Sequence, residues 1–123
     1  MTKGCKRALL RLAKENPYRE VAGFLTGRHY RSSGRLVVSG VAGVVAGGAD
    51  RVPFSAASAV DGAVGWFHSH PGAVDLLSPS DLAHVEAFPW RPFVTVLISH
   101  TASGRPRLLA WLCDRRGYRL MRT

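Results

Sequence analysis

The chain has 123 residues, of which 46% are hydrophobic, and this length and composition predict one globular domain spanning residues 1–123. No apolar run is long enough to span a membrane, and Arg11 and Lys14 interrupt the apolar stretch near the start, which excludes the core of a signal peptide. We therefore expect a cytoplasmic protein. Seventeen Lys and Arg residues against eight Asp and Glu residues give a net charge of +9, which indicates an acidic partner or nucleic acid.

The first part of the chain predicts a helix followed by a β-hairpin. Apolar residues recur on one side of residues 2–16 and basic residues on the other, which is typical of an amphipathic helix, and Asn16-Pro17 ends it. A strand from about Val21 to Tyr30 and a second at residues 36–45 flank a turn at residues 32–34.

The rest of the chain predicts further strands and a second helix. A turn at residues 47–50 leads to a short strand at 51–54 and a connector of small residues at 55–61. Strands are predicted at 63–68, 93–99, 108–114 and 118–122, and a helix that begins at Ser78 lies between the first two. The fold class is therefore α+β, with a curved, mixed or antiparallel sheet flanked by helices.

The two cysteines and the distribution of charge limit the range of possible functions. Cys5 and Cys113 do not make a disulfide framework, so we expect them to be free and buried, with a bridge between them as the alternative. The basic residues are scattered along the chain and include no basic run with interleaved aromatic residues. This distribution favours an acidic protein substrate over nucleic acid.

The motif His68-Ser69-His70-Pro71 ends a small, apolar strand. Because alternate residues of a strand point to the same face, His68 and His70 project together. Ser78 is a good helix N-cap and Asp81 lies in the first turn of that helix, so Asp81 can complete a set of two histidines and one carboxylate. Three such ligands leave the fourth position of a zinc ion open for water. Two alternatives stay open: Asp75 as the carboxylate ligand, or a Ser78–Asp81 capping box that needs no metal.

The pattern of Glu20, the His68–Pro71 motif, Ser78 and Asp81 resembles the signature of the JAMM/MPN+ zinc metalloproteases. The segment from Glu20 to Gly27 is also similar to the first strand of that family. The resemblance implies an MPN-like fold with cytidine-deaminase-like layering. It further implies that His68, His70 and Asp81 bind zinc, that Glu20 is the general acid and base for the bound water, and that Ser78 stabilises the tetrahedral intermediate.

The resemblance implies one Zn²⁺ per chain, with a bound catalytic water, in a zinc-dependent isopeptidase or peptidase. Its substrates would be ubiquitin-like or sulfur-carrier proteins of β-grasp fold, cut after a C-terminal Gly-Gly. The chain lacks the insertions with which eukaryotic members grip ubiquitin and the C-terminal helices with which some members pair. It is therefore similar to a minimal archaeal or bacterial type, and we expect a monomer or a weak homodimer.

Two other functions compete with the peptidase. A RadC-like, nucleic-acid-associated protein shares the fold, and the basic composition favours it, but RadC-like proteins carry Asn where this chain has Ser69 between the histidines. A non-catalytic MPN scaffold is the third interpretation. Such scaffolds lose the metal ligands, whereas this chain keeps all of them.

Overall fold

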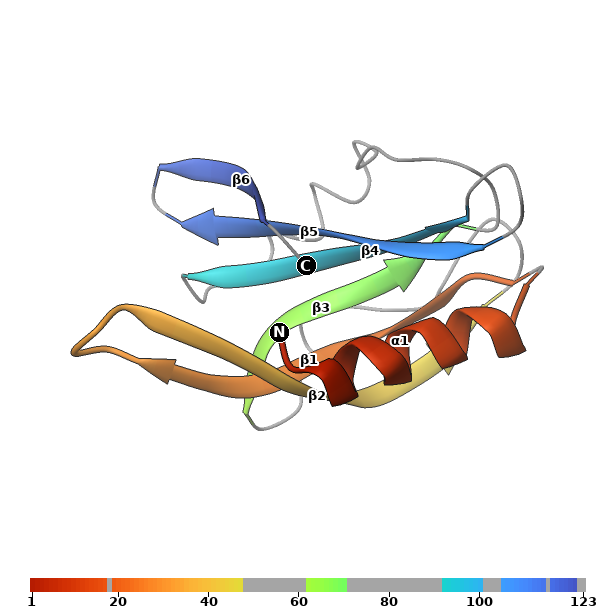
Figure 1. Cartoon of the computed structure of the whole chain (residues 1–123), viewed down its shortest axis with the longest axis horizontal. Helices are drawn as coiled ribbons and strands as arrows, with labels where there is room; N and C mark the ends of the chain where they lie inside the picture. The colour runs from red at the N-terminus through yellow and green to blue at the C-terminus, as the bar shows by residue number, and fades with distance from the viewer. Residues whose placement is uncertain (18, 48–61, 71–91, 101–104, 115, 122–123) are drawn as a thin grey trace.

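The computed structural model describes residues 1–17, 19–47, 62–70, 92–100, 105–114 and 116–121. The described residues form one helix and six strands in a single sheet with the order β2-β1-β3-β4-β5-β6 (Figure 1). The bounds are α1 Lys3–Glu15, β1 Val21–Tyr30, β2 Arg35–Ala46, β3 Ala63–Ser69, β4 Phe93–His100, β5 Pro106–Asp114 and β6 Gly117–Met121.

These elements confirm the predicted α+β class, and of the two predicted alternatives for the sheet, mixed or antiparallel, the sheet is mixed. Strands β3 and β4 pair in parallel, and the other neighbouring pairs are antiparallel. The predicted short strand at 51–54 and the predicted helix from Ser78 lie outside the described residues.

Helix α1 begins and ends as its sequence predicts. The Thr2 hydroxyl accepts a hydrogen bond from the Cys5 N–H at 3.2 Å, which caps the first turn, and Asn16 ends the helix before Pro17. The Thr2 N–H also donates to the Val38 carbonyl at 2.9 Å, which ties the helix start to β2. The helix has 13 residues and, in the described part of the chain, no helix is long and apolar enough to cross a membrane.

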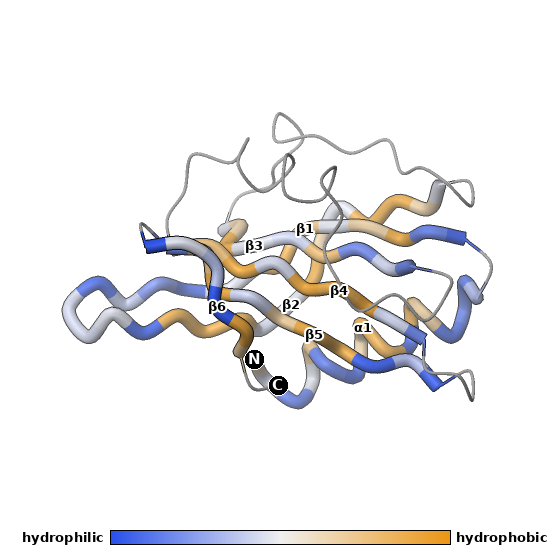
Figure 2. Tube along the Cα trace, turned by 90° about the horizontal axis from the view of Figure 1, so that it is seen from above, coloured by the Kyte–Doolittle hydropathy of each residue, from blue (hydrophilic) through white to orange (hydrophobic). Residues whose placement is uncertain are grey.

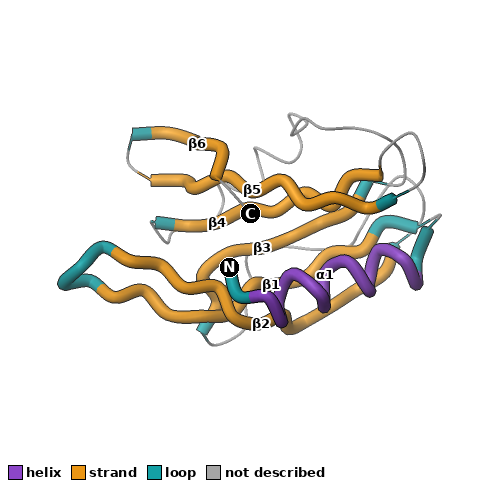
Figure 3. The backbone as a smooth tube through the Cα atoms, in the orientation of Figure 1, coloured by secondary structure: helices purple, strands orange, loops and turns teal. Residues whose placement is uncertain are grey.

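Helix α1 lies along one face of the sheet (Figures 2 and 3). Its buried residues Cys5, Leu9 and Ala13 join a core that includes Leu25, Phe67 and alternate residues of β4. A second cluster, on the opposite face, contains Ala22, Phe24, Trp66, Phe93 and Cys113. Strand β4 contributes to both clusters, and its first seven residues are buried, which explains why most of its residues are apolar.

Cys5 and Cys113 are free and buried, which confirms the prediction and excludes the bridge between them. They lie in different clusters, on opposite faces of the sheet. Burial raises the pKa of the Cys5 thiol, and the nearby N-terminal ammonium lowers it by less. A thiol with a raised pKa is a poor nucleophile, so Cys5 is a core residue.

Strand β3 requires a glycine at position 65. A Cβ there would collide with the carbonyl oxygen of Val94 on β4. The absence of a side chain lets β3 approach β4 closely, three residues before His68.

Candidate metal centre

The pairing of β1 with β3 brings Glu20 to the histidine motif. Ala22 is paired with His68 and Phe24 with Trp66 in a regular antiparallel register. Continuing this register by one pair beyond each strand end puts Glu20 opposite His70. Because Glu20 has the same parity on the chain as Ala22 and Phe24, it belongs to the face of the sheet that carries His68.

Two backbone contacts fix the position of Glu20. The N–H of the next residue, Val21, donates to the Ser69 hydroxyl at 2.9 Å, in a buried hydrogen bond between residues 48 positions apart. The Glu20 carbonyl accepts from the Gly47 N–H at 2.9 Å. Ser69, which separates the two histidines, therefore holds the start of β1 against the end of β3.

The two histidine rings approach each other with their Nε2 atoms. The Nε2 atoms of His68 and His70 lie 3.1 Å apart, and the rings meet edge to face with centroids 4.8 Å apart. Two nitrogens bound at about 2.0–2.1 Å to one tetrahedral zinc lie about 3.3–3.4 Å apart. The observed separation is that of a hydrogen bond between the two rings, and it is also close enough to this value for the pair of imidazoles to fit a zinc ion bound through both Nε2 atoms.

The orientation of the His68 ring is set by packing. The ring stacks on Trp66, with centroids 4.8 Å apart and planes 14° from parallel, and His68 is only 4% exposed. His70 is half-buried and lies one residue beyond β3, where the site opens. The His68 ring is thus packed in place, whereas the His70 ring is partly exposed to solvent.

Comparison with known proteins identifies the family. Residues 2–114 match the sequence model of the prokaryotic homologues of the JAB domain. The chain belongs to this family. The JAB/MPN family includes metalloproteases. The family resemblance that Glu20 and the histidine motif predict is therefore confirmed.

Solved structures support the fold of this JAB domain. The solution structure of protein DSY2949 from Desulfitobacterium hafniense matches with a TM-score of 0.54 and 18% sequence identity, over 98% of this chain and 87% of that one. At this identity the likeness concerns the fold alone. The comparison with curated proteins gave no significant match.

The remaining predicted site residues of the JAB domain lie outside the described residues. These are Ser78 and Asp81, together with the alternative ligand Asp75. Within the described residues, no three His, Cys, Asp or Glu side chains form a group that could hold a metal. Glu20, His68 and His70 therefore do not form such a group in the described part of the chain, and the role of Glu20 as an acid and base stays a prediction.

His100, at the end of β4, is a neighbour that the sequence did not single out. Its Nδ1 lies 3.1 Å from the His70 carbonyl oxygen. Because a carbonyl only accepts, Nδ1 carries the proton and donates. The His70 N–H in turn donates to the Ile98 carbonyl at 3.0 Å. The backbone of His70 is thus held on both sides by β4. The only sequence signal was a histidine that closes an apolar strand.

Proposed function

We propose that this JAB domain is a zinc-dependent isopeptidase or peptidase that hydrolyses the bond after the C-terminal Gly-Gly of a ubiquitin-like or sulfur-carrier protein of β-grasp fold. The observation that carries the proposal is the convergence of the His68 and His70 Nε2 atoms at 3.1 Å, beside the position of Glu20. Asp81 is the proposed third ligand.

Each proposed residue has one chemical task. The metal, when bound, supplies a Lewis acid and lowers the pKa of water to about 7. The Glu20 carboxylate takes a proton from the attacking water and returns it to the leaving amine, a role that typically contributes about 10²–10⁴-fold in rate. The Ser78 hydroxyl donates a hydrogen bond to the carbonyl oxygen as negative charge develops there.

The family and the charge support the proposed substrate class. A Gly-Gly tail has no side chains, so its backbone can approach a buried pair of histidines closely. The net charge of +9 favours an acidic protein. Two free, buried cysteines agree with a reducing compartment, and we propose that the protein acts in the cytoplasm as a monomer or a weak homodimer.

The proposal is tested by cleavage of an acidic sulfur-carrier protein fused through Gly-Gly to a reporter. We expect cleavage by the wild type, loss of cleavage with a chelator, and recovery when zinc is added back. Glu20→Gln should retain zinc but lose at least about 10²-fold in kcat. Glu15→Gln removes the same charge from an exposed position at the end of α1 and should behave like the wild type. Cleavage that persists in the metal-free protein would refute the proposal.

A further inference from the structure

The β1–β2 hairpin continues beyond the rest of the sheet. Pairing between β1 and β3 stops at Thr26, whereas pairing between β1 and β2 continues to Tyr30 and Arg35. The hairpin therefore projects past the start of β3 as a two-stranded ribbon (Figure 1). Such a ribbon adds little stability by itself, so its length needs another explanation.

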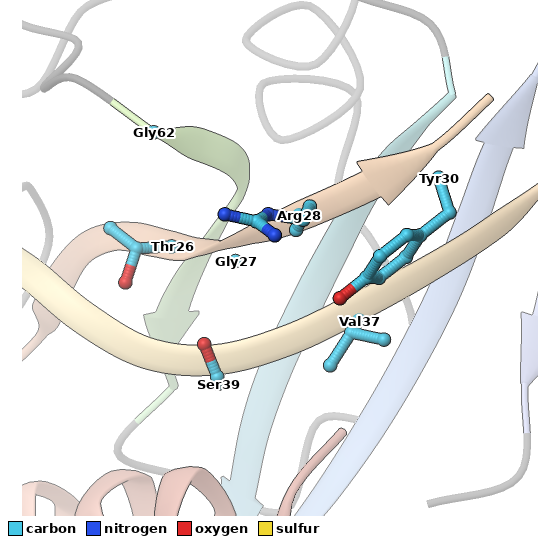
Figure 4. A pocket seen from close by; sticks show the side chains of 7 residues that line it. All are labelled: Thr26, Gly27, Arg28, Tyr30, Val37, Ser39 and Gly62. Carbon is cyan, nitrogen blue, oxygen red and sulfur yellow. The ribbon is translucent and has the colours of Figure 1, made fainter.

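The hairpin carries an open depression of about 510 Å³ (Figure 4). Thr26 and Ser39 line it with hydroxyls, Arg28 with a guanidinium, and Tyr30 and Val37 with apolar surface. Tyr30 is 44% exposed, so part of its ring is available at the surface of the hairpin. The described residues of the depression therefore offer hydrogen-bond donors, one cation and one aromatic surface to a ligand.

The charge of the hairpin favours an anionic ligand. The sequence has no Asp or Glu between Glu20 and Asp50, whereas Arg28, Arg31 and Arg35 all belong to the hairpin and are exposed. A guanidinium beside hydroxyl donors matches a carboxylate in both geometry and charge.

The depression lies on the same face of the sheet as His68. At each register shift along β1, the extra residue belongs to the partner strand, β2 or β3, and not to β1. The side chains of β1 therefore alternate between the two faces of the sheet without interruption from Ala22 to Tyr30. Arg28 is six residues from Ala22, the partner of His68, which corresponds to about 20 Å along the strand. A ligand that reaches both places must be larger than a short peptide tail.

We propose that this depression is a second docking site for the protein substrate and that it binds a carboxylate on the acidic surface of the folded domain whose tail enters the metal centre. Arg28 pairs with the carboxylate, the hydroxyls of Thr26 and Ser39 donate to it, and Tyr30 packs against the neighbouring surface. This inference rests on the proposed function and adds where the body of the substrate is held.

The geometry favours a protein over a nucleic acid. The Arg28 guanidinium lies over the Tyr30 ring, 5.8 Å from its centroid, and Tyr30 is the one aromatic residue among the described residues that line the depression. Single-stranded nucleic acids bind through stacking of bases on such rings. One guanidinium within a local depression also matches a single carboxylate better than a series of phosphates.

The test compares two substrates and two variants. One substrate is the acidic sulfur-carrier fusion, and the other is a short peptide with the same Gly-Gly bond, which is too small to reach the hairpin. Arg28→Ala should raise KM for the fusion by about tenfold with little change in kcat, and should leave the peptide unaffected. Arg11→Ala removes the same charge from α1, on the opposite face, and should change neither.

The outcomes separate the docking site from the proposed function. If both substrates are cleaved and Arg28→Ala changes KM no more than Arg11→Ala, the docking site is wrong and the peptidase stands. If neither substrate is cleaved, direct binding of the labelled sulfur-carrier protein decides: a loss of affinity in Arg28→Ala alone supports the site, and equal affinities overturn it. If single-stranded DNA displaces the labelled protein and Arg28→Ala weakens DNA binding as much, the site is one for nucleic acid and the proposal fails.

Discussion

Ser69→Ala is expected to destabilise the protein more than the loss of one hydroxyl group suggests. Ser69 is 1% exposed, and its hydroxyl accepts from the buried N–H of Val21 at 2.9 Å. Alanine would leave that N–H without an acceptor in a site closed to water. The cost of an unsatisfied buried donor is about 1–3 kcal/mol. For a chain of this size, the melting temperature should fall by about 3–5 °C for each kcal/mol.

The assay is urea unfolding followed by tryptophan fluorescence, to which the buried Trp66 contributes, with Thr95→Val as a matched control. Among the described residues, the Thr95 hydroxyl is buried without a hydrogen-bond partner, so its removal should leave stability unchanged or raise it. We expect a lower urea midpoint for Ser69→Ala at an unchanged slope. Equal midpoints for Ser69→Ala and the wild type would show that this hydrogen bond does not hold β1 against β3.

Three further predictions follow from the fold. His100→Ala should weaken zinc binding by about tenfold, since losing a contact that orients a metal ligand typically costs about 10–100-fold, and His100→Asn, whose amide can still donate to the His70 carbonyl, should restore most of it in a competition titration. Gly65→Ala should lower the free energy of unfolding by at least about 1–3 kcal/mol, measured by thermal unfolding, because the added Cβ would collide with Val94. Gly4→Ala, with open space around the added Cβ, should not lower it. The Arg116 N–H and the Arg119 guanidinium hold the Asp114 pKa below its usual value. Asp114→Asn should therefore lower the free energy of unfolding at pH 7, and the difference from the wild type should vanish as the pH falls below that lowered pKa. A difference in stability that does not depend on pH would contradict this assignment.

Local sequence patterns predicted most of the fold. The bounds of β1 were predicted correctly because Pro17 stops the helix before it and the turn at residues 32–34 follows it. The end of β3 was predicted one residue short. The choice of strand partners is not local, so the sequence did not predict the β3–β4 parallel pair or the order of the sheet.

In the candidate site, too, local features were predicted from the sequence and long-range contacts were not. The spacing of His68 and His70 predicted that they project together, and their Nε2 atoms converge. The roles of Ser69 and His100 depend on contacts with residues that are distant in the sequence, namely Val21 and His70. No periodicity within one segment could have revealed them. The predicted roles of Ser78 and Asp81 stay predictions.

Whether the histidine pair holds zinc is measured most directly by the metal content of the purified protein after dialysis. We expect about one equivalent of zinc per chain in the wild type, and loss of most of it in both His68→Ala and Asp81→Ala. His29→Ala, which removes a histidine from the hairpin instead, should retain the metal. Full zinc occupancy in both His68→Ala and Asp81→Ala would contradict the metal centre, and with it the proposed chemistry.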